Sequence, residues 1–475
     1  MMTRTEQRKS SAQKLPPIAW LGISLTVLMG LGSGIRWLSG FPIAGGQDAS
    51  QGFLRQSVQM SRGKGLFFPQ DGTMDKTAAK GAFANQDYAT AAQLFRLSLQ
   101  RKPNDPEARI YFNNANASEA NPLQLAVSVP ISNDANGAKE ILRGVAQAQQ
   151  EINQKGGVKG RPIYITIAND GDDPQLARQI ATEFVNDPRI LGVVGHYASS
   201  VTLATAEIYD RGQLVAISPI SSAVQLSHKS SYVFRTLPND AVAARSLADY
   251  TIQTLNRKKP VVYFNSQSDY SKSLMSEFRN AIAQQNGQVV AEYDLSNTNL
   301  SASQSLQEAQ LKGADVVMLA SNTGSLDRAI QVMQANQARL PLLGGDDVYT
   351  PKTLEVSQAA AEDLVVAVPW HGAAANSQAF ADRSRQWWGG DVNWRTVTAY
   401  DATMALIAGL EANPTRQGVQ QALTQPTFTV PGASHSITFL PSGDRNIPVQ
   451  LVKVVRGRRS GFGYDFIPID SNRAL

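Results

Sequence analysis

The sequence predicts an α/β protein of two lobes, each a mostly parallel sheet flanked by helices and joined to the other lobe by crossing segments. From Leu123 on, short apolar runs alternate with amphipathic helical patterns, which is typical of parallel sheets covered by helices. The apolar run Ile190–Val194 ends at Gly195, as a buried parallel strand does. The same alternation starts again at Pro260, so the chain holds two such units.

The order of the runs assigns each element to a lobe. In the first lobe, strands are expected at 123–129, 163–168, 190–194 and 214–217, and helices at 138–155, 174–186 and from Ser199 on. In the second, strands are expected at 260–264, 288–293, 316–320 and 341–343, and helices at 271–285, 303–312 and 326–335. The chain crosses between lobes near 232–236 and 364–370, followed by helices at 380–387 and 396–410 and strands at 436–439 and 449–455. The lobes are therefore predicted as 122–236 with 370–427, and 237–369 with 428–470.

The N-terminal region predicts a membrane attachment. Residues 1–17 are basic, and residues 18–35 carry no charge. Eighteen helical residues span roughly 27 Å, close to the thickness of the hydrocarbon core. Basic residues before the span place the N-terminus in the cytoplasm and the remainder outside it. We expect an uncleaved anchor within residues 1–38, with a cleaved signal peptide as the alternative. Residues 39–75 lack periodicity, which indicates a linker.

Residues 76–118 are predicted to be helical. Tyr88, Ala91, Phe95 and Pro103 have the spacing of a tetratricopeptide repeat, which this segment resembles. One full helical pair is visible, whereas arrays of such repeats need at least three units. The segment is therefore either a small helical cap or spacer, or a module that docks a partner.

Composition and charge exclude several classes of protein. The 475 residues suffice for two or three domains, and 42% hydrophobic with 17% charged residues is an ordinary globular balance. Much of the net charge of +5 lies near the N-terminus, and no Lys/Arg run interleaved with aromatics follows, so we expect no nucleic-acid partner. The absence of cysteine excludes disulfides, thiol nucleophiles, cysteine-based metal sites and a lipid-modified cysteine anchor.

Small hydroxyl residues follow two strand ends of the first lobe. Ser199 comes after the strand that ends at Val194, and Ser218-Pro219 ends the next strand. Ligands of open α/β sheets sit beyond the carboxyl ends of the strands, and free N–H groups at a helix start favour an anion. These loops are therefore predicted to form the floor of a binding site.

The same stretch resembles a known family. The motifs are Gly195-His196-Tyr197-Ala198-Ser199-Ser200 and Ile217-Ser218-Pro219-Ile220-Ser221-Ser222. With their spacing they resemble the type I periplasmic solute receptors, close to the leucine/isoleucine/valine receptors of ABC importers, over about 123–467. The resemblance implies the two-lobed periplasmic-binding-protein type I fold. It also implies a receptor at the outer face of the cytoplasmic membrane or in the periplasm, which closes on an amino acid and delivers it to ABC permease subunits.

The resemblance also implies roles for single residues. Ser199 and Ser222 match positions that hold the ligand's carboxylate, and Ile220 would contribute its backbone; Ser199 as a plain helix N-cap is the alternative. Asp346 stands where the family carries an acidic partner for the ammonium group, and the neighbouring Asp347 fits the same place one residue on. Tyr270 stands where the family places a tyrosine that contacts the ligand.

Three further residues complete the predicted site. Tyr197 belongs to the first motif, and Trp370 would either line the pocket or pack the hinge. Asn322 stands where the family tends to carry tyrosine. The loop 133–137 also lacks a tyrosine that the branched-chain receptors often have. These departures argue against copying a branched-chain specificity.

An enzyme is not expected. The four histidines are widely spread, and neither a G-x-S-x-G nucleophile elbow nor a phosphate-binding loop is present. His196 lies three residues before Ser199 without an evident third catalytic group. Asp170, Asp172 and Asp173 favour a loop and helix cap over a calcium site. We therefore expect no cofactor and no metal. The alternative function is a ligand sensor of the same fold that signals to a protein partner through residues 76–118.

Overall fold

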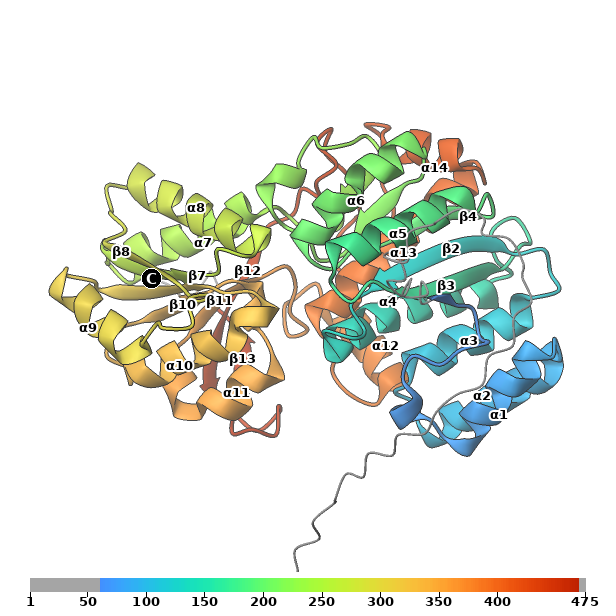
Figure 1. The fold of residues 1–475 in the computed structure, drawn as a ribbon, viewed down its shortest axis with the longest axis horizontal. Helices are drawn as coiled ribbons and strands as arrows, with labels where there is room; N and C mark the ends of the chain where they lie inside the picture. Colours follow the sequence, from blue (N-terminus) through green and yellow to red (C-terminus); the bar gives the residue numbers. More distant parts are fainter. Residues whose placement is uncertain (1–59, 470–475) are drawn as a thin grey trace, which may run out of the picture. The chain divides into compact units, whose positions relative to one another are not determined.

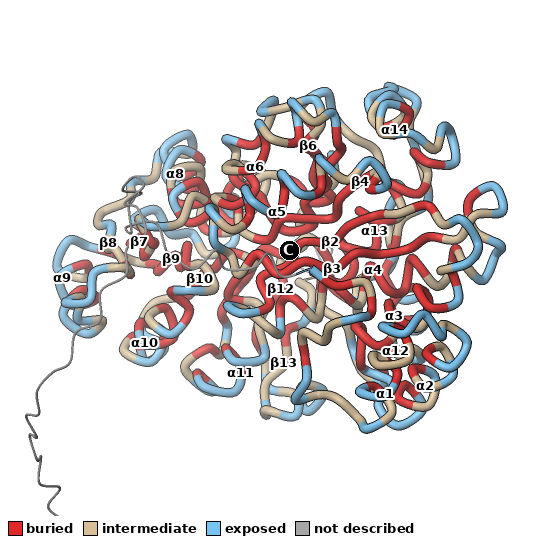
Figure 2. The backbone as a smooth tube through the Cα atoms, turned by 45° about the vertical axis from the view of Figure 1, so that its right-hand side comes forward, coloured by how far each residue is buried: buried red, intermediate tan, exposed pale blue. Residues whose placement is uncertain are grey.

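The computed structural model describes residues 60–469, which form two α/β lobes (Figure 1). The first lobe holds a six-stranded sheet of order β1-β3-β2-β4-β5-β6, in which all neighbours pair in parallel except β1 with β3. Its strands are β1 (Met60–Ser61), β2 (Leu123–Val129), β3 (Ile163–Asn169), β4 (Ile190–Val194), β5 (Ala216–Ser218) and β6 (Val233–Arg235). The backbone of β2, β3 and β4 is buried along most of its length (Figure 2).

Helices cover both faces of the first sheet. One face carries α5 and α6, and the other carries α4 and α13 (Figure 1). The helices of this lobe are α4 (Ala135–Gln154), α5 (Pro174–Asn186), α6 (Ser199–Arg211), α12 (Gln378–Trp388), α13 (Trp394–Ala412) and α14 (Arg416–Leu423). Three helices precede them: α1 (Met74–Ala84), α2 (Tyr88–Arg101) and α3 (Pro106–Ala117).

The second lobe holds a seven-stranded sheet of order β13-β12-β11-β10-β9-β7-β8. Its strands are β7 (Pro260–Phe264), β8 (Ala291–Asp294), β9 (Val316–Ala320), β10 (Leu342–Gly344), β11 (Val365–Val368), β12 (Gln450–Arg456) and β13 (Tyr464–Pro468). The first five are parallel, and β12 and β13 add an antiparallel edge. The helices are α7 (Asp240–Asp249), α8 (Asp269–Gln284), α9 (Ala302–Leu311), α10 (Leu326–Asn336) and α11 (Pro351–Ser357).

The predicted fold class is confirmed, with local differences. The predicted strands β2, β4, β7 and β9 have the bounds that the apolar runs indicated. The strand predicted at 436–439 is wrong, because those residues make only isolated pairs, Val430 with Ile437 and Phe439 with Arg445. The antiparallel strand β13 was not predicted, since its alternation is short and interrupted by charge.

Residues 60–73 are packed, although the sequence predicted a linker through residue 75. Strand β1 pairs with the edge of β3, and Phe68 is buried. The N–H groups of Phe67 and Phe68 donate to the carboxylate of Glu107, at 2.6 and 3.3 Å. The carboxylate of Glu107, about 40 residues further along the chain, therefore holds this glycine-containing stretch in place. The local sequence alone does not reveal this contact. Residues 1–59, with the predicted anchor, lie outside the described residues.

Helices α1 to α3 are joined to one another and to the first sheet. Lys76 of α1 is fully buried and pairs with Asp105 at 2.7 Å and with Glu107 at 2.8 Å. Asn114 of α3 acts as a surrogate strand partner, because its amide accepts from the N–H of Ile165 at 2.9 Å and donates to the C=O of Ile165 at 2.8 Å. The helical segment is thus an extension of the first lobe.

Two buried ion pairs fix the region where the chain passes between the lobes. The chain crosses after β6, after β11 and before β12. Arg235 at the first crossing donates to Asp444 at the third, at 2.7 Å. The next residue, Arg445, pairs with Asp401 of α13. Removal of one partner from such a buried pair is strongly destabilising, because the other charge stays buried.

The contacts of residues 428–447 favour a different lobe boundary from the predicted one. Phe439 packs against Phe234 of β6, and the N–H of Ala433 donates to Asp401 of α13 at 2.7 Å. The N–H of His228 also donates to the C=O of Ser442. We therefore propose that this stretch belongs to the first lobe and that the second lobe resumes at β12.

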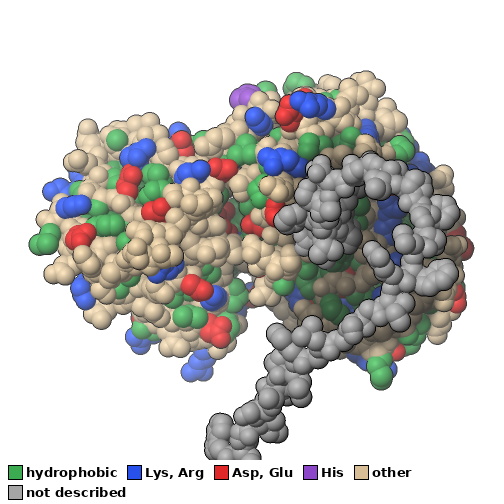
Figure 3. All heavy atoms as spheres, in the orientation of Figure 1, with side chains coloured by type: hydrophobic (Ala, Val, Ile, Leu, Met, Phe, Trp, Pro, Cys, Tyr) green, Lys and Arg blue, Asp and Glu red, His purple; other side chains and the backbone are tan. Residues whose placement is uncertain are grey.

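Charged side chains of both signs are interspersed over the face drawn in Figure 3. Within residues 60–469, no helix combines the length and the apolar character that a membrane span requires. The predicted span at 18–35 is not among these residues.

The substitution Asn114→Ala is expected to lower the free energy of unfolding by about 2–4 kcal/mol, because the buried N–H and C=O groups of Ile165 would lose their partner. Urea unfolding of the full-length protein measures this change. The matched control is Asn116→Ala on the same helix. The exposed amide of Asn116 bonds only to Phe112 of its own helix, so a change within about 0.5 kcal/mol is expected. Equal losses in both variants would contradict the role given to Asn114.

Candidate functional site

The first lobe brings its predicted hydroxyls to the carboxyl ends of β4 and β5. Ser199 is the first residue of α6 and is buried, and its Oγ accepts from the N–H of Ala223 at 3.3 Å. Ala198, not Ser199, is the N-cap of α6, so the plain capping role is wrong. Ser222 lies in the loop after β5 and is buried. Its hydroxyl has no hydrogen-bond partner among the described residues.

The second lobe contributes a tyrosine and two adjacent carboxylates. Asp346 follows Gly345 just beyond the end of β10, and Tyr270 lies in the first turn of α8. The Tyr270 hydroxyl donates to Asp346 Oδ1 at 2.7 Å. Burial raises the pKa of Asp346, and the charge of neighbouring Asp347 raises it further, while Tyr270 and Arg395 oppose the rise. A cation placed beside Asp346 would therefore stabilise its ionised form.

Ser222, Tyr270 and Asp346 line one small cavity between the lobes. Its free volume is about 10 Å³, room for roughly one water molecule. The wall towards the crossings is made by Leu237, Pro238, Pro369 and Val449, which come from all three crossing segments. The structure thus brings together three of the eight predicted site residues at the hinge end of the cleft.

Asp240 also lines this cavity and was missed by the sequence analysis. It opens α7 after the first crossing, is buried, and has an Oδ2 atom without a hydrogen-bond partner among the described residues. Burial raises the pKa of Asp240 to about 6, against the opposing effects of the Ser273 and Ser222 hydroxyls. The sequence did contain a signal for Asp240, because it is an acidic residue at the start of a helix that directly follows a crossing.

Other predicted residues lie around the cavity without lining it. The N–H of Ile220 donates to Ser218 Oγ at 3.3 Å. The amide oxygen of Asn322 accepts from Asn265 at 2.8 Å and from Ser325 at 2.7 Å. These partners engage the N–H of Ile220 and the amide oxygen of Asn322, two of the groups that the sequence analysis offered to a ligand.

Trp370 packs the hinge region. It is buried edge-on against Phe380 of α12, with ring centroids 6.4 Å apart. Of the two roles that the sequence left open, its contacts favour the packing role.

Tyr197 and Arg395 form a direct bridge between the lobes. Tyr197 Oη lies 3.1 Å from Thr323 Oγ1 of the second lobe and donates to Asp134 Oδ2 at 3.1 Å. Arg395 of α13 donates to Asp347 Oδ1 of the second lobe at 2.6 Å. Burial acts to lower the pKa of Arg395, but Tyr197 and Asp347 together with other carboxylates raise it overall. Arg395 was not predicted, because it is a single basic residue at the start of a long helix, where the local sequence gives no sign of its partner.

His196 supports the floor of the site and does not face Ser199. Its ring is fully buried, with Nδ1 2.7 Å from Asp170 Oδ2 and Nε2 2.8 Å from Tyr209 Oη. Its C=O accepts from Ser218 Oγ at 2.7 Å, which ties the loop after β4 to the end of β5. These contacts position the loop that carries Tyr197 and Ser199.

The aspartates after β3 act locally. Asp173 caps α5, and Asp170 accepts from His196 or Ser128. Burial raises the pKa of Asp172 to about 7, with Asp170 and Asp347 adding to the effect. In residues 60–469, no three acidic or histidine side chains are grouped in a way that suits a metal ion.

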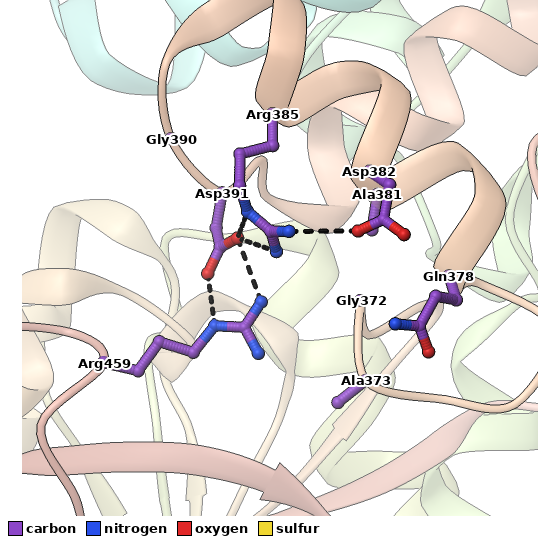
Figure 4. A pocket seen from close by; sticks show the side chains of 9 residues that line it. All are labelled: Gly372, Ala373, Gln378, Ala381, Asp382, Arg385, Gly390, Asp391 and Arg459. Atoms are coloured by element: carbon purple, nitrogen blue, oxygen red, sulfur yellow. Dashed lines mark hydrogen bonds and ion pairs between the residues drawn. The ribbon is translucent and has the colours of Figure 1, made fainter.

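A larger hollow of about 570 Å³ lies elsewhere between the lobes and contains none of the predicted residues. Asp391, between α12 and α13, is held there by two guanidinium groups (Figure 4). Arg385 donates to it at 2.6 Å, and Arg459 of the second lobe pairs with it at 2.5 Å. All three side chains are half exposed, so this bridge is weakened by solvent.

Known proteins resemble this chain in sequence and in fold. An "Amino acid binding protein" of Pseudomonas aeruginosa is 31% identical over 147 residues, which cover 31% of this chain and 39% of that protein. The "Leucine-specific-binding protein" of Salmonella typhimurium is 25% identical over 229 residues, covering 48% and 62%. The matched segments thus span less than two thirds of these relatives. An ABC transporter substrate-binding protein from Desulfitobacterium hafniense, solved in complex with Leu, shares the fold with a TM-score of 0.63 and 24% identity, covering 73% of this chain and all of that one.

The family model described as "Periplasmic binding protein" matches residues 122–461. Its members are solute-binding proteins and not enzymes. The match covers well over half of the sequence and includes both lobes. This chain therefore belongs to the periplasmic binding protein family.

Proposed function

We propose that this protein is an extracytoplasmic solute receptor that closes on a small amino acid-like ligand and delivers it to an ABC importer. The observation that carries the proposal is the cavity at the hinge end of the cleft. It is lined by Ser222 from one lobe and by Asp240, Tyr270 and Asp346 from the other. The Ser222 hydroxyl makes no hydrogen bond of ordinary length to a described residue, although it lies close enough to Asp240 to lower the pKa of that carboxyl. One hydroxyl of the first lobe thus faces two carboxylates across a small buried space.

This arrangement suits a zwitterion. The hydroxyls of Ser199 and Ser222 would donate to a carboxylate, and Asp346 would pair with an ammonium group, with Asp240 as a second carboxylate. Each charged end of the ligand would then belong to a different lobe, so binding favours the closed state. Buried charges are costly unless they are paired, so a ligand that lacks one of its two charges would be rejected. The receptor would bind and release the ligand without changing it chemically.

The names of relatives support the wider role. Amino acid and leucine-specific binding proteins are among the sequence relatives, and an ABC transporter substrate-binding protein is among the similar folds. Delivery to permease subunits and attachment outside the cytoplasmic membrane through residues 18–35 are proposed on this basis and on the N-terminal sequence.

Calorimetric titration of the full-length protein with the standard amino acids tests the proposal. At least one amino acid is expected to bind, whereas its decarboxylated amine and its deaminated acid are expected to give no saturable heat, because each leaves one end of the site unpaired. Saturable binding of an uncharged sugar, with no heat from any amino acid, would refute the proposal.

The substitution Asp346→Asn is expected to weaken amino acid binding by about 10- to 100-fold, since it removes a charge-assisted hydrogen bond to the ammonium group. The matched control is Asp327→Asn, which alters an exposed carboxylate of the same lobe that pairs only with Lys352. Calorimetry measures the dissociation constants of the wild type and of both variants. An unchanged affinity in Asp346→Asn would remove its assigned role.

Binding is expected to tighten as the pH rises from about 5 to about 8, by at most about tenfold per pH unit for each proton released. The pKa values of Asp346 and Asp240 are raised in the ligand-free protein, so both hold protons at the acid end and must ionise to pair with ammonium. Tyr270, Asp347 and Arg395 also face Asp346. The raised pKa values of Tyr270 and Arg395 keep the first neutral and the second charged across this range, whereas burial raises the pKa of Asp347 as well. Affinities measured across this range should be flatter for Asp346→Asn, and a flat profile for the wild type would contradict the assignment.

A further inference from the structure

A second interlobe cluster adjoins the proposed ligand site. We call it the Arg395 cluster, and its members are Asp134, Tyr197, Thr323, Asp347 and Arg395. Asp134, Tyr197 and Arg395 belong to the first lobe, whereas Thr323 and Asp347 belong to the second. The cluster therefore fills part of the cleft with the protein's own charges.

Hydrogen bonds link the members of the cluster. Asp347 accepts from Arg395 Nη2 at 2.6 Å through one oxygen and from the N–H of Thr323 at 3.1 Å through the other. Arg395 Nε donates to Tyr197 Oη at 3.3 Å. The guanidinium also lies over the ring of Trp394, 4.4 Å from its centroid. Tyr197, Arg395 and Asp347 are buried, at 4%, 4% and 9% exposure.

The chain places this cluster directly beside the ligand site. Asp347 follows Asp346, Thr323 follows Asn322, and Tyr197 precedes Ser199 by two residues. The opposite wall of the cavity is formed by the crossing segments, through Leu237, Pro238, Pro369 and Val449. A ligand held between the serines and Asp346 therefore cannot extend towards the hinge. Its side chain is expected to extend towards the Arg395 cluster, whose members are chain neighbours of Asp346 and Ser199.

We propose that Arg395 is a specificity-determining residue: paired with Asp347 across the lobes, it fills the space into which a ligand's side chain would extend. The site then takes amino acids with short side chains and rejects leucine, isoleucine and valine. This inference rests on the proposed function and names the ligand class of the same site.

The rejection follows from what displacement would leave behind. A branched side chain would have to push the guanidinium aside, which leaves Asp347 buried without its cation and Tyr197 without a donor. An apolar side chain offers neither group a replacement. Any amino acid must widen a cavity whose free volume is about 10 Å³, but the short side chains of glycine, alanine and serine require the smallest displacement of the guanidinium.

A second interlobe ion pair supplies a matched control. Arg459 bridges from the second lobe to Asp391 of the first at the hollow shown in Figure 4, and neither residue lines the small cavity. Its removal loosens the closed state without making room beside the ligand. The substitution Arg459→Ala is therefore expected to change the affinities of all amino acids by a similar factor.

The experiment titrates glycine, alanine, serine and leucine into the full-length wild type, the double variant Arg395→Ala/Asp347→Ala and the Arg459→Ala variant. The double variant removes both charges, so that neither stays buried alone. In the wild type, the tightest of the three small amino acids is expected to bind at least tenfold more tightly than leucine. The double variant should reduce that ratio at least tenfold, and Arg459→Ala should leave it unchanged.

Each outcome decides between the proposals. Wild-type leucine affinity equal to that of alanine overturns the role of Arg395 and leaves the proposed function standing. An unchanged ratio in a double variant that melts cooperatively overturns it as well. No binding of any amino acid overturns both the inference and the proposed function. If the double variant does not fold, the wild-type ranking alone decides.

Discussion

Two neighbouring residues of opposite charge, Asp444 and Arg445, hold the third crossing to the first crossing and to helix α13 of the first lobe. Asp444 pairs with Arg235 of the first crossing, and Arg445 pairs with Asp401 of the first lobe. Both pairs are buried, so each charge depends on its partner for a favourable environment. Because the crossings also form one wall of the small cavity, the geometry of the candidate site depends on these two ion pairs.

The cleft of this protein is more highly charged than a site for apolar side chains requires. Asp240 and Asp346 reach the cavity, while Asp347 and Arg395 neutralise each other beside it. The burial that raises the pKa values of Asp240 and Asp346 also makes a cation the natural partner for both groups. The hydroxyls of the opposite lobe have no charge of their own and suit an anion. The second lobe therefore suits the positive end of a ligand, and the first lobe suits the negative end.

The sequence predicted what depends on local pattern. Buried strands such as Ile190–Val194 and Pro260–Phe264 were found because their apolar runs are short and end at glycine, asparagine or serine positions. Ser222 and Asp346 were predicted because each follows a strand end of its own lobe and matches a position that the family resemblance assigns to the ligand. Asp240 and Arg395 were missed, since their roles arise only when distant segments approach. For the same reason, the packing of residues 60–73 was not predicted, since it depends on hydrogen bonds to the distant Glu107. The place of residues 428–447 was also missed, because their sequence has no periodicity.

The attachment of β1 and α1 to α3 distinguishes the two lobes mechanically. Residue 60 enters the described structure as an edge strand on β3, and Asn114 and Glu107 fasten the following segment to the first lobe alone. Under the proposed attachment through residues 18–35, a pull on the anchor would reach the first sheet before the second. The second lobe would then be the one that moves when the cleft opens or closes.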